Sequence, residues 1–360
     1  MDDWLRRIVD LADGFKQSMV ILTAAELDLF GVLGSQELSE RQIARRIKAQ
    51  PRATRLWLNA LAALGVIEKK DGRYANTPQG RRFLDRASPE YRGSFLRHIV
   101  RYWPQWAALT DVVRAGEPAA RRGRGGTAAE FAWAMHDLSV ERAKEVAAVL
   151  WPQAGRAARA EDGEPTALDL GGGPGTYAAA MAKRDPRLKV TVFDRPEILE
   201  VTRQLAKREA LTDRITFLPG DFMTDALCAS PARATRRASG DIGCGYDLIL
   251  VSSVIHSYGE AEVRAILRKC AAALRPGGRL AVHDFLLDET MTRPVDAALF
   301  SVHMLVVSSG GRSYSTGEVS KWMRAAVLSN VKHVPIGDGT SSLLIATRPR
   351  RGRPCQREAI

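Results

Sequence analysis

The chain has 360 residues and a formal net charge of +12 at pH 7, with 45% hydrophobic and 26% charged residues. This composition is typical of a soluble globular protein long enough for two domains. A membrane protein is excluded, because no apolar run in the sequence approaches the roughly 18 residues of a membrane helix. The N-terminus lacks a secretory-signal pattern, and the four cysteines lack metal-ligand spacing, so we expect a reduced cytoplasmic protein without a metal site.

The excess positive charge lies mainly in three segments rich in glycine, alanine or proline. Residues 119–126 carry +3, residues 228–245 carry +2 and residues 346–360 carry +4. A DNA-binding surface would instead line one ordered face with Lys and Arg. We therefore expect an irregular basic insertion, a basic disordered tail over 349–360 and no nucleic-acid partner. A weak polyanion contact is the alternative.

Residues 1–90 predict a helical domain that ends in a hairpin. Ser39 and Gln42 have the spacing of a capping box, and Asp71-Gly72 is a strong hairpin signal. This order is typical of a winged helix, which serves either DNA binding or dimerisation. The longest helix has few polar side chains to read base edges, so dimerisation is favoured. The helices expected here are 15–22, 24–33, 40–47 and one after Pro51.

Residues 91–160 predict a helical connector rich in aromatic side chains. Phe131 and Met135 lie four residues apart and would share one helix face. Such a face suits either a core contact or the wall of a pocket for a flat apolar ligand. The stretch 154–166, rich in alanine and charged residues, is a plausible linker.

Residues 161–348 alternate between strand and helix patterns, which predicts an α/β domain with a parallel sheet covered on both faces. The strands are expected at 167–170, 189–193, 215–218, 247–252, 279–284 and 342–349. The helices are expected from 175, at 196–209, at 260–274 and within 310–326.

The stretch LDLGGGPGT at Leu168–Thr176 predicts a strand, a tight glycine turn and a helix. Glycine permits positive φ there and lets a ligand approach the main chain. Asp194 ends the next strand, where an acid can accept both hydroxyls of a ribose. The pattern indicates a nucleoside-containing cofactor, and it alone would also fit a nicotinamide dehydrogenase.

Three further segments lie where strands of such a domain end. Gly220-Asp221-Phe222 would place an acid and an aromatic ring near an adenine. His256 falls just beyond a strand end, the edge at which open α/β sheets bind ligands. The segment LRPGGRLAVHDF predicts a Pro-Gly-Gly turn into a strand.

Together these segments resemble the S-adenosylmethionine-dependent O-methyltransferases of the plant caffeate type and their bacterial secondary-metabolite relatives. The resemblance covers most of the chain. It implies a winged-helix dimerisation domain, a helical connector lining the acceptor pocket and a Rossmann-like methyltransferase domain. It also implies S-adenosylmethionine as cofactor, a phenolic or polyketide-like small-molecule acceptor and a homodimer.

The resemblance also implies roles for single residues. His256 would be the general base, since a phenol with a pKa near 10 is mostly protonated at neutral pH, and Asp284 would orient it. Phe131, Met135 and Met304 would line the acceptor pocket. The implied cofactor contacts are Asp169, Gly171, Gly172, Gly173, Asp194, Asp221, Phe222 and Ser252.

The chain departs from the family pattern around the base. Ser257 and Tyr258 replace the usual Asp-Trp pair, Asp284 replaces a Glu, and Ser313 stands where a second carboxylate is usual. C-methylation and a homologue without methyl transfer therefore stay open, as does a ligand-sensing winged-helix regulator. The alternative to a catalytic role is that His256 only caps the helix that begins near Glu260. His283 and His303 lie near these positions; we expect both to be structural, and a contribution to the site is the alternative.

Overall fold

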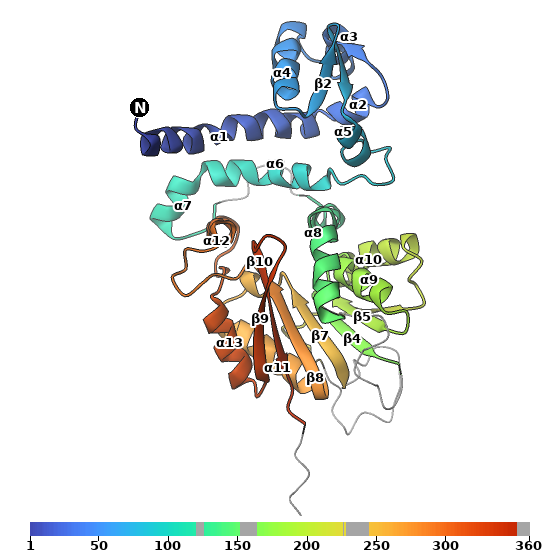
Figure 1. Ribbon diagram of the computed structural model, residues 1–360, viewed down its shortest axis with the longest axis vertical. Helices are drawn as coiled ribbons and strands as arrows, with labels where there is room; N and C mark the ends of the chain where they lie inside the picture. The colour runs from blue at the N-terminus through green and yellow to red at the C-terminus, as the bar shows by residue number, and fades with distance from the viewer. Residues whose placement is uncertain (120–125, 152–163, 226, 228–244, 351–360) are drawn as a thin grey trace, which may run out of the picture. The chain divides into compact units, whose positions relative to one another are not determined.

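The computed structural model describes residues 1–119, 126–151, 164–225, 227 and 245–350 (Figure 1). Most of the predicted linker, nearly all of the basic insertion and the tail beyond residue 350 lie outside this part. The chain divides into two compact units. Unit 1 comprises Met1–Trp103 with Gly123–Leu138, and unit 2 comprises Pro104–Arg122 with Ser139–Ile360. The predicted connector is thus shared between the units.

Unit 1 has the element order expected of a winged helix, with a small sheet in the order β1-β3-β2. Its core is formed by apolar side chains of α1 to α4 and the hairpin, among them Leu29, Ile43, Leu58 and Tyr74. The elements are α1 (Asp3–Glu26), α2 (Leu29–Leu33), β1 (Leu38–Ser39), α3 (Glu40–Arg46), α4 (Pro51–Ala63), β2 (Ile67–Lys70), β3 (Arg73–Asn76) and α5 (Pro78–Phe83).

Two predicted local signals are confirmed in unit 1. Gln42 N donates to Ser39 Oγ, and Ser39 N donates to Gln42 Oε1, which completes the capping box. Asp71 and Gly72 have φ values of 47° and 74°, the left-handed conformation of a tight hairpin turn. The short strand β1, which pairs with β3, was not predicted, because two residues carry no periodicity.

The first helix differs from the prediction. The expected helix 15–22 is the second half of α1, which begins at Asp3 because the Asp2 side chain accepts hydrogen bonds from Trp4 N and Leu5 N. Several apolar side chains of α1 are exposed, with Trp4 and Leu11 each 68% and Phe15 50% accessible. Unit 1 therefore presents an apolar helix face to solvent.

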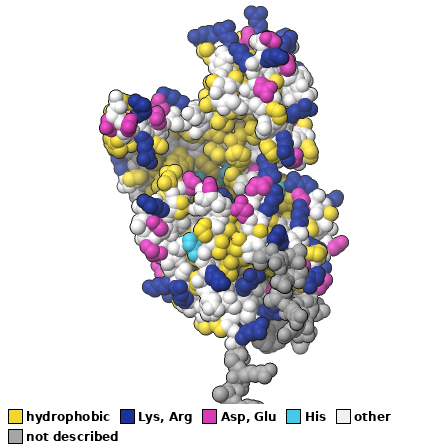
Figure 2. Space-filling model, in the orientation of Figure 1, with side chains coloured by type: hydrophobic (Ala, Val, Ile, Leu, Met, Phe, Trp, Pro, Cys, Tyr) yellow, Lys and Arg dark blue, Asp and Glu magenta, His cyan; other side chains and the backbone are white. Residues whose placement is uncertain are grey.

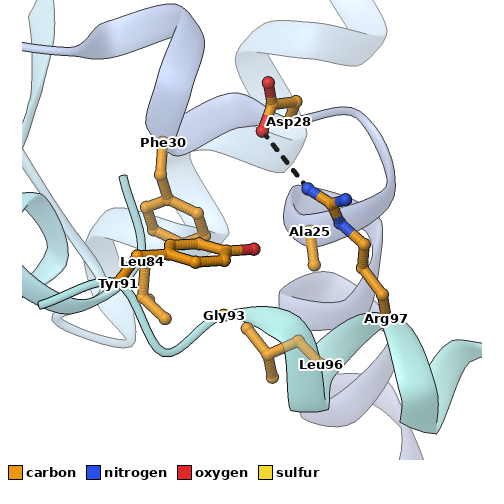
Figure 3. Close-up of a pocket in the computed structure, with 8 residues that line it drawn as sticks. All are labelled: Ala25, Asp28, Phe30, Leu84, Tyr91, Gly93, Leu96 and Arg97. Carbon is orange, nitrogen blue, oxygen red and sulfur yellow. Dashed lines mark ion pairs between the residues drawn. The ribbon is translucent and has the colours of Figure 1, made fainter. Parts of the chain in front are cut away.

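Unit 1 also contains a small gap in its packing, beside the start of α2 and the start of α6 (Ser94–Ala107) (Figure 3). Asp28 forms ion pairs there with Arg97 at 3.8 Å and with Arg86 at 3.0 Å. Tyr91 and Leu96 line the same gap. None of the predicted site residues lies in it.

Unit 2 is built on a seven-stranded sheet in the order β6-β5-β4-β7-β8-β10-β9. The first five strands of this order run parallel, but β10 is antiparallel to both β8 and β9. The predicted parallel sheet is thus confirmed for these five strands, and at one edge β9 and β10 add an antiparallel hairpin. The strands are β4 (Thr166–Leu170), β5 (Lys189–Asp194), β6 (Ile215–Pro219), β7 (Tyr246–Ser252), β8 (Leu274–Asp284), β9 (Ser329–Ile336) and β10 (Ser341–Thr347).

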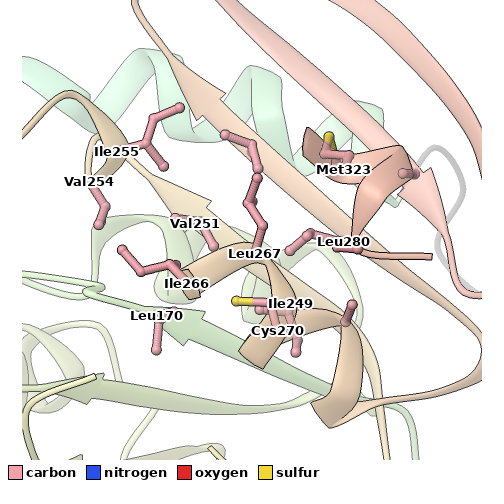
Figure 4. Packing of buried hydrophobic residues seen from close by; sticks show 14 of the residues in the cluster. Leu170, Ile249, Val251, Val254, Ile255, Ile266, Leu267, Cys270, Leu280 and Met323 are labelled. Carbon is pink, nitrogen blue, oxygen red and sulfur yellow. The ribbon is translucent and has the colours of Figure 1, made fainter. Parts of the chain in front are cut away.

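The sheet is covered by an apolar layer on each face. On β7, Ile249 and Val251 belong to one core cluster with α11 and α13, whereas Leu248 and Leu250 belong to the other with α8 and α9 (Figure 4 shows the first). Burial on both faces explains why this strand is almost wholly apolar in sequence. The helices are α7 (Leu109–Ala115), α8 (Ala128–Leu150), α9 (Thr176–Arg184), α10 (Pro196–Arg208), α11 (Glu260–Ala273), α12 (Val295–Val307) and α13 (Thr316–Ala325).

The predicted Pro-Gly-Gly turn lies inside strand β8. Pairing with β7 shifts from Tyr246↔Leu274 to Leu248↔Arg279, so extra residues of β8 bulge out of the ladder. Gly277 has φ 83° there. The separate turn that we expected is thus a β-bulge at the start of a longer strand.

Positive side chains do not gather into one patch on the visible face. Figure 2 shows Lys and Arg of the described residues spread among acidic and apolar side chains. Within the described ranges, no helix combines the length and apolar character needed to cross a membrane.

Candidate active site

The glycine loop follows β4 at the carboxyl edge of the sheet. Gly171 and Gly173 have φ values of 65° and 56°, which favour glycine. A Cβ on Gly171 would lie 2.8 Å from Val254 Cγ2, so the loop packs closely on one side. A Cβ on Gly172 would lie 2.7 Å from Asp169 Cγ, whereas one on Gly173 would meet no atom within 4 Å. The loop thus offers open backbone at Gly173.

Asp194 is brought to this loop from the end of β5. Gly173 N donates to Asp194 Oδ2 at 2.8 Å, and Arg195 N donates to Asp194 Oδ1 at 2.7 Å. Burial raises the pKa of Asp194 above its usual range, although both backbone hydrogen bonds oppose the shift. Each carboxylate oxygen keeps a further lone pair for a ligand hydroxyl.

Asp169 is fully buried beneath the loop and only partly satisfied. Its Oδ2 accepts a hydrogen bond from Ala178 N at 3.2 Å, but its Oδ1 has no partner among the described residues. Burial, with the nearby charge of Asp194, raises the pKa of Asp169 to about 7 against the opposing backbone hydrogen bond. A buried carboxylate oxygen without a partner fits a ligand that carries a hydrogen-bond donor.

Phe222 reaches the glycine loop from the other side. A Cβ on Gly171 would lie 3.3 Å from Phe222 Cε1, and the Phe222 ring is centred 5.7 Å from that of Tyr258. Asp221 is exposed, and its Oδ1 accepts from Met223 N at 2.8 Å. The ring of Phe222 is therefore placed beside the loop, as the proposed adenine contact requires.

Ser252 lies in a buried polar network at the end of β7. Its Oγ is 2.9 Å from His283 Nδ1, and His283 Nε2 is 3.1 Å from Ser341 Oγ. Burial lowers the pKa of His283 to about 4, so this histidine is neutral at pH 7. The network joins β7, β8 and β10. The contact of Ser252 with a cofactor stays a prediction.

His256 lies in a short 3₁₀ helix, Ile255–Ser257, just after β7. Its Nδ1 is 2.7 Å from Asp284 Oδ1, and Phe285 N donates to the same oxygen at 2.8 Å. Burial raises the pKa of Asp284, but the charge and hydrogen bond of His256 outweigh burial, and the pKa is lowered. Because an ionised carboxylate only accepts, Nδ1–H donates to Asp284, which leaves Nε2 as the ring nitrogen that can take up a proton. The N-cap of α11 is Gly259, so His256 does not cap that helix.

Aromatic rings surround His256. The Phe300 ring contacts it edge-on with centroids 4.8 Å apart, and the Phe285 ring is 4.3 Å from that of Phe300. His303 Nδ1 accepts a hydrogen bond from Trp106 Nε1 at 3.2 Å, a contact between α12 and α6.

Other predicted pocket residues are distributed over both units. Met304 is buried in unit 2. Its side chain lies close to Gly311, because a Cβ on that glycine would be 2.8 Å from Met304 Cε and would overlap the backbone oxygen of His256. Phe131 and Met135 belong to unit 1, where the Phe131 ring contacts His98, and their place in an acceptor pocket stays a prediction. Ser313 Oγ donates to the carbonyl oxygen of Ala297 at 3.0 Å.

Two polar groups near the site were not found from the sequence. The Arg142 guanidinium lies 5.2 Å from the centre of the Phe285 ring and makes no ion pair with any described residue. Burial raises the pKa of the Tyr177 hydroxyl, against the opposing effect of nearby Ser252 and Ser139, but this hydroxyl makes no hydrogen bond of normal distance and angle with a described residue. The charge of Arg142 opposes the rise in the pKa of Tyr177 and adds to the fall in the pKa of His283. No sequence pattern marked either residue.

Comparison with known proteins identifies the family. A family model described as an O-methyltransferase domain matches residues 106–327, and an O-methyltransferase dimerisation domain matches residues 9–86. The chain belongs to the O-methyltransferase family. The predicted enzyme class, an S-adenosylmethionine-dependent O-methyltransferase, is thereby confirmed, as is its cofactor. Within the described ranges, no three His, Cys, Asp or Glu side chains form a cluster that could hold a metal ion.

Two bacterial relatives and one solved structure cover almost the whole chain. The tetracenomycin polyketide synthesis 8-O-methyl transferase of Streptomyces glaucescens is 30% identical over 95% of this chain and 96% of its own. The 3-hydroxy-5-methyl-1-naphthoate 3-O-methyltransferase of Streptomyces sahachiroi is 29% identical over 91% and 90%. An O-methyltransferase family protein from Burkholderia thailandensis is 26% identical over 97% and 99%, with a TM-score of 0.79.

Proposed function

We propose that the protein methylates a phenolic or polyketide-like hydroxyl of a small molecule, with His256 as general base. The observation that carries this proposal is the hydrogen-bonded pair of His256 and Asp284 at the sheet edge that also bears the glycine loop. The two bacterial relatives, named for a tetracenomycin polyketide and a hydroxynaphthoate, support an aromatic acceptor.

Residues of unit 2 fit the cofactor at both of its ends. The unpartnered Asp169 Oδ1 suits the ammonium of the amino-acid end, and Arg142 with the Tyr177 hydroxyl suits its carboxylate. We assign Asp194 to the ribose hydroxyls, because both of its oxygens keep a free lone pair, and Phe222 to the adenine, because its ring lies beside the glycine loop. When bound, S-adenosylmethionine supplies an activated methyl group on a sulfonium.

The base removes the proton that makes a phenol a poor nucleophile. With the cofactor bound, His256 Nε2 would take the proton of the acceptor hydroxyl and later release it to solvent. The acceptor oxygen would bond to the methyl carbon as the S–CH3 bond breaks and S-adenosylhomocysteine leaves. Asp284 keeps Nδ1 protonated and stabilises the imidazolium. A positioned base of this kind contributes roughly 10²- to 10⁴-fold to the rate.

The surroundings of His256 favour a flat acceptor. Phe300 and Phe285 present aromatic faces and edges, and Met304 adds a flexible apolar side chain. The ring of an aromatic acceptor can stack or pack edge-on against such a set.

We further propose that the protein is a homodimer through unit 1. The dimerisation family model covers residues 9–86, and the exposed apolar face of α1 would be buried by a second copy. Replacing Phe15 with Glu should shift the molecular mass measured by light scattering from dimer to monomer. A wild-type monomer at micromolar concentration would contradict this assignment.

Incubation with labelled S-adenosylmethionine and a panel of hydroxylated naphthoates and polyketide phenols tests the proposed activity. We expect a mass gain of one methyl group and, by NMR, an O-methyl signal. A C-methyl product would show that the chain carries out the alternative chemistry. Transfer to none of the acceptors, together with no calorimetric binding of S-adenosylhomocysteine, would refute the proposal.

A further inference from the structure

Lys269, on α11, makes contacts that neither the family nor the proposed chemistry explains. Its Nζ donates hydrogen bonds to three backbone carbonyls of the loop after β6: Phe222 O at 2.8 Å, Met223 O at 2.8 Å and Asp225 O at 3.0 Å. An ammonium has three donors, so all of them are used. Lys269 forms no ion pair with a carboxylate in the described part of the chain. All three N–H donors of the Lys269 ammonium are therefore used by this loop.

The loop itself is a single tight turn. Asp221 O accepts from Thr224 N at 3.1 Å and from Asp225 N at 2.7 Å, and Asp225 Oδ2 accepts from Asp221 N at 2.8 Å. These bonds use the N–H groups of the turn and leave the carbonyls of Phe222, Met223 and Asp225 for Lys269. Without the ammonium, three carbonyls that are close together would lack a donor.

The turn begins with Asp221 and Phe222, the two residues proposed to contact the adenine. Phe222 lies against Gly171 and Tyr258, while its own carbonyl is held by Lys269. Fixing the carbonyl restricts the backbone from which the ring projects. The ring then needs little further ordering when a ligand arrives, which favours binding.

We propose that Lys269 is a positioning residue for the adenine end of the cofactor site. It holds the turn 221–225 in the conformation that presents Asp221 and Phe222. This inference rests on the proposed function, since it takes the adenine to lie at Phe222. Lys269 itself contacts neither reacting atom, so its effect is on cofactor affinity and not on methyl transfer.

Two ligands and one variant separate this role from a general loss of stability. In the full-length protein, Lys269→Met should raise the calorimetric Kd of S-adenosylhomocysteine and of 5′-methylthioadenosine by roughly tenfold each, because both carry the adenine. The kcat at saturating cofactor and the KM of the acceptor should stay within about twofold of wild type. Amide exchange of 221–225 should accelerate, while that of α11 should not.

Arg268→Met is the matched control. Arg268 is exposed on the same helix next to Lys269, and its replacement removes the same charge. It should leave both Kd values unchanged, which separates the hydrogen bonds from a long-range effect of charge.

Wild-type affinity for both ligands in a folded Lys269→Met protein would overturn the inference. If that variant does not fold, Lys269→Gln keeps two donors on a shorter side chain. It should then show raised Kd values, and unchanged values would likewise overturn the inference. A wild-type protein that binds neither ligand would instead refute the proposed function, so the two failures are distinguishable.

Discussion

The two halves of the site in unit 2 satisfy their polar groups in opposite ways. Around the glycine loop, Asp169 Oδ1 and the Tyr177 hydroxyl are buried and make no hydrogen bond of normal geometry with the residues that the structure describes. Around the base, the Asp284 carboxylate accepts from His256 Nδ1 and Phe285 N. The first half is complete only with a ligand of matching polar groups, whereas the second is preorganised and bordered by rings. In the proposed site, polar matching would therefore select the cofactor, and shape would select the acceptor.

Removal of the imidazole should affect the base half alone and give the largest effect. His256→Ala is expected to lower kcat by roughly 10²- to 10⁴-fold, because the acceptor proton loses its base. The Kd of S-adenosylhomocysteine should not change. Single-turnover kinetics and calorimetry measure the two quantities. Full activity in this variant would show that His256 is not the general base, although the protein would still be a methyltransferase.

A smaller loss is expected when only the orientation of the base is disturbed. Asp284→Asn keeps the size of the side chain but removes the charge that favours Nδ1–H and stabilises the imidazolium. We expect kcat to fall roughly 10- to 100-fold. Since Asp284 also accepts from Phe285 N, a thermal unfolding scan should accompany the assay. Equal losses in His256→Ala and in the double variant would show that Asp284 acts through His256.

Two ligands distinguish contacts to the amino-acid end of the cofactor from contacts to its adenosine end. Arg142→Gln should weaken S-adenosylhomocysteine by about 2 kcal/mol, roughly 30-fold in Kd, because the carboxylate loses its cation. 5′-Methylthioadenosine lacks that carboxylate and should bind as before. Lys144→Gln, an exposed change on the same helix, is the control. Equal weakening of both ligands would contradict a role for Arg142 at the amino-acid end.

Asp169 makes the cofactor half sensitive to pH. Its pKa of about 7 means that the free protein holds a proton there below neutrality, and an ammonium from the ligand would expel it. S-Adenosylhomocysteine should therefore bind more tightly as pH rises from 5 to 7, by up to about tenfold per unit, and level off above 7. Calorimetry in buffers of different ionisation enthalpy counts the released proton. Asp169→Asn should flatten the profile.

The parts of the site that follow strand ends could be predicted from the sequence. Asp194 and His256 each come directly after an apolar run, and parallel strands place such residues at one edge. Their hydrogen bonds to Gly173 and Asp284 then arise from neighbouring strands of the sheet.

Contacts made by helix packing could not be predicted in this way. Arg142 and Lys269 sit on amphipathic helices, where a basic residue usually indicates only a solvated face. Their partners are an aromatic ring and backbone carbonyls that no sequence spacing encodes. The bulge in β8 was missed for a related reason: Pro-Gly-Gly is a turn signal, and only pairing with β7 extends the strand through it.

The thiol of Cys270 has a practical consequence for measuring how unit 2 opens. Cys270 is fully buried in the α11 core cluster, and burial raises its pKa to about 12 (Figure 4). At pH 8 only about one thiol in 10⁴ is ionised, so an alkylating reagent must wait for the core to open. In a chain whose other three cysteines are replaced by serine, the labelling rate would report the lifetime of the closed core. Saturating S-adenosylhomocysteine should then slow the labelling.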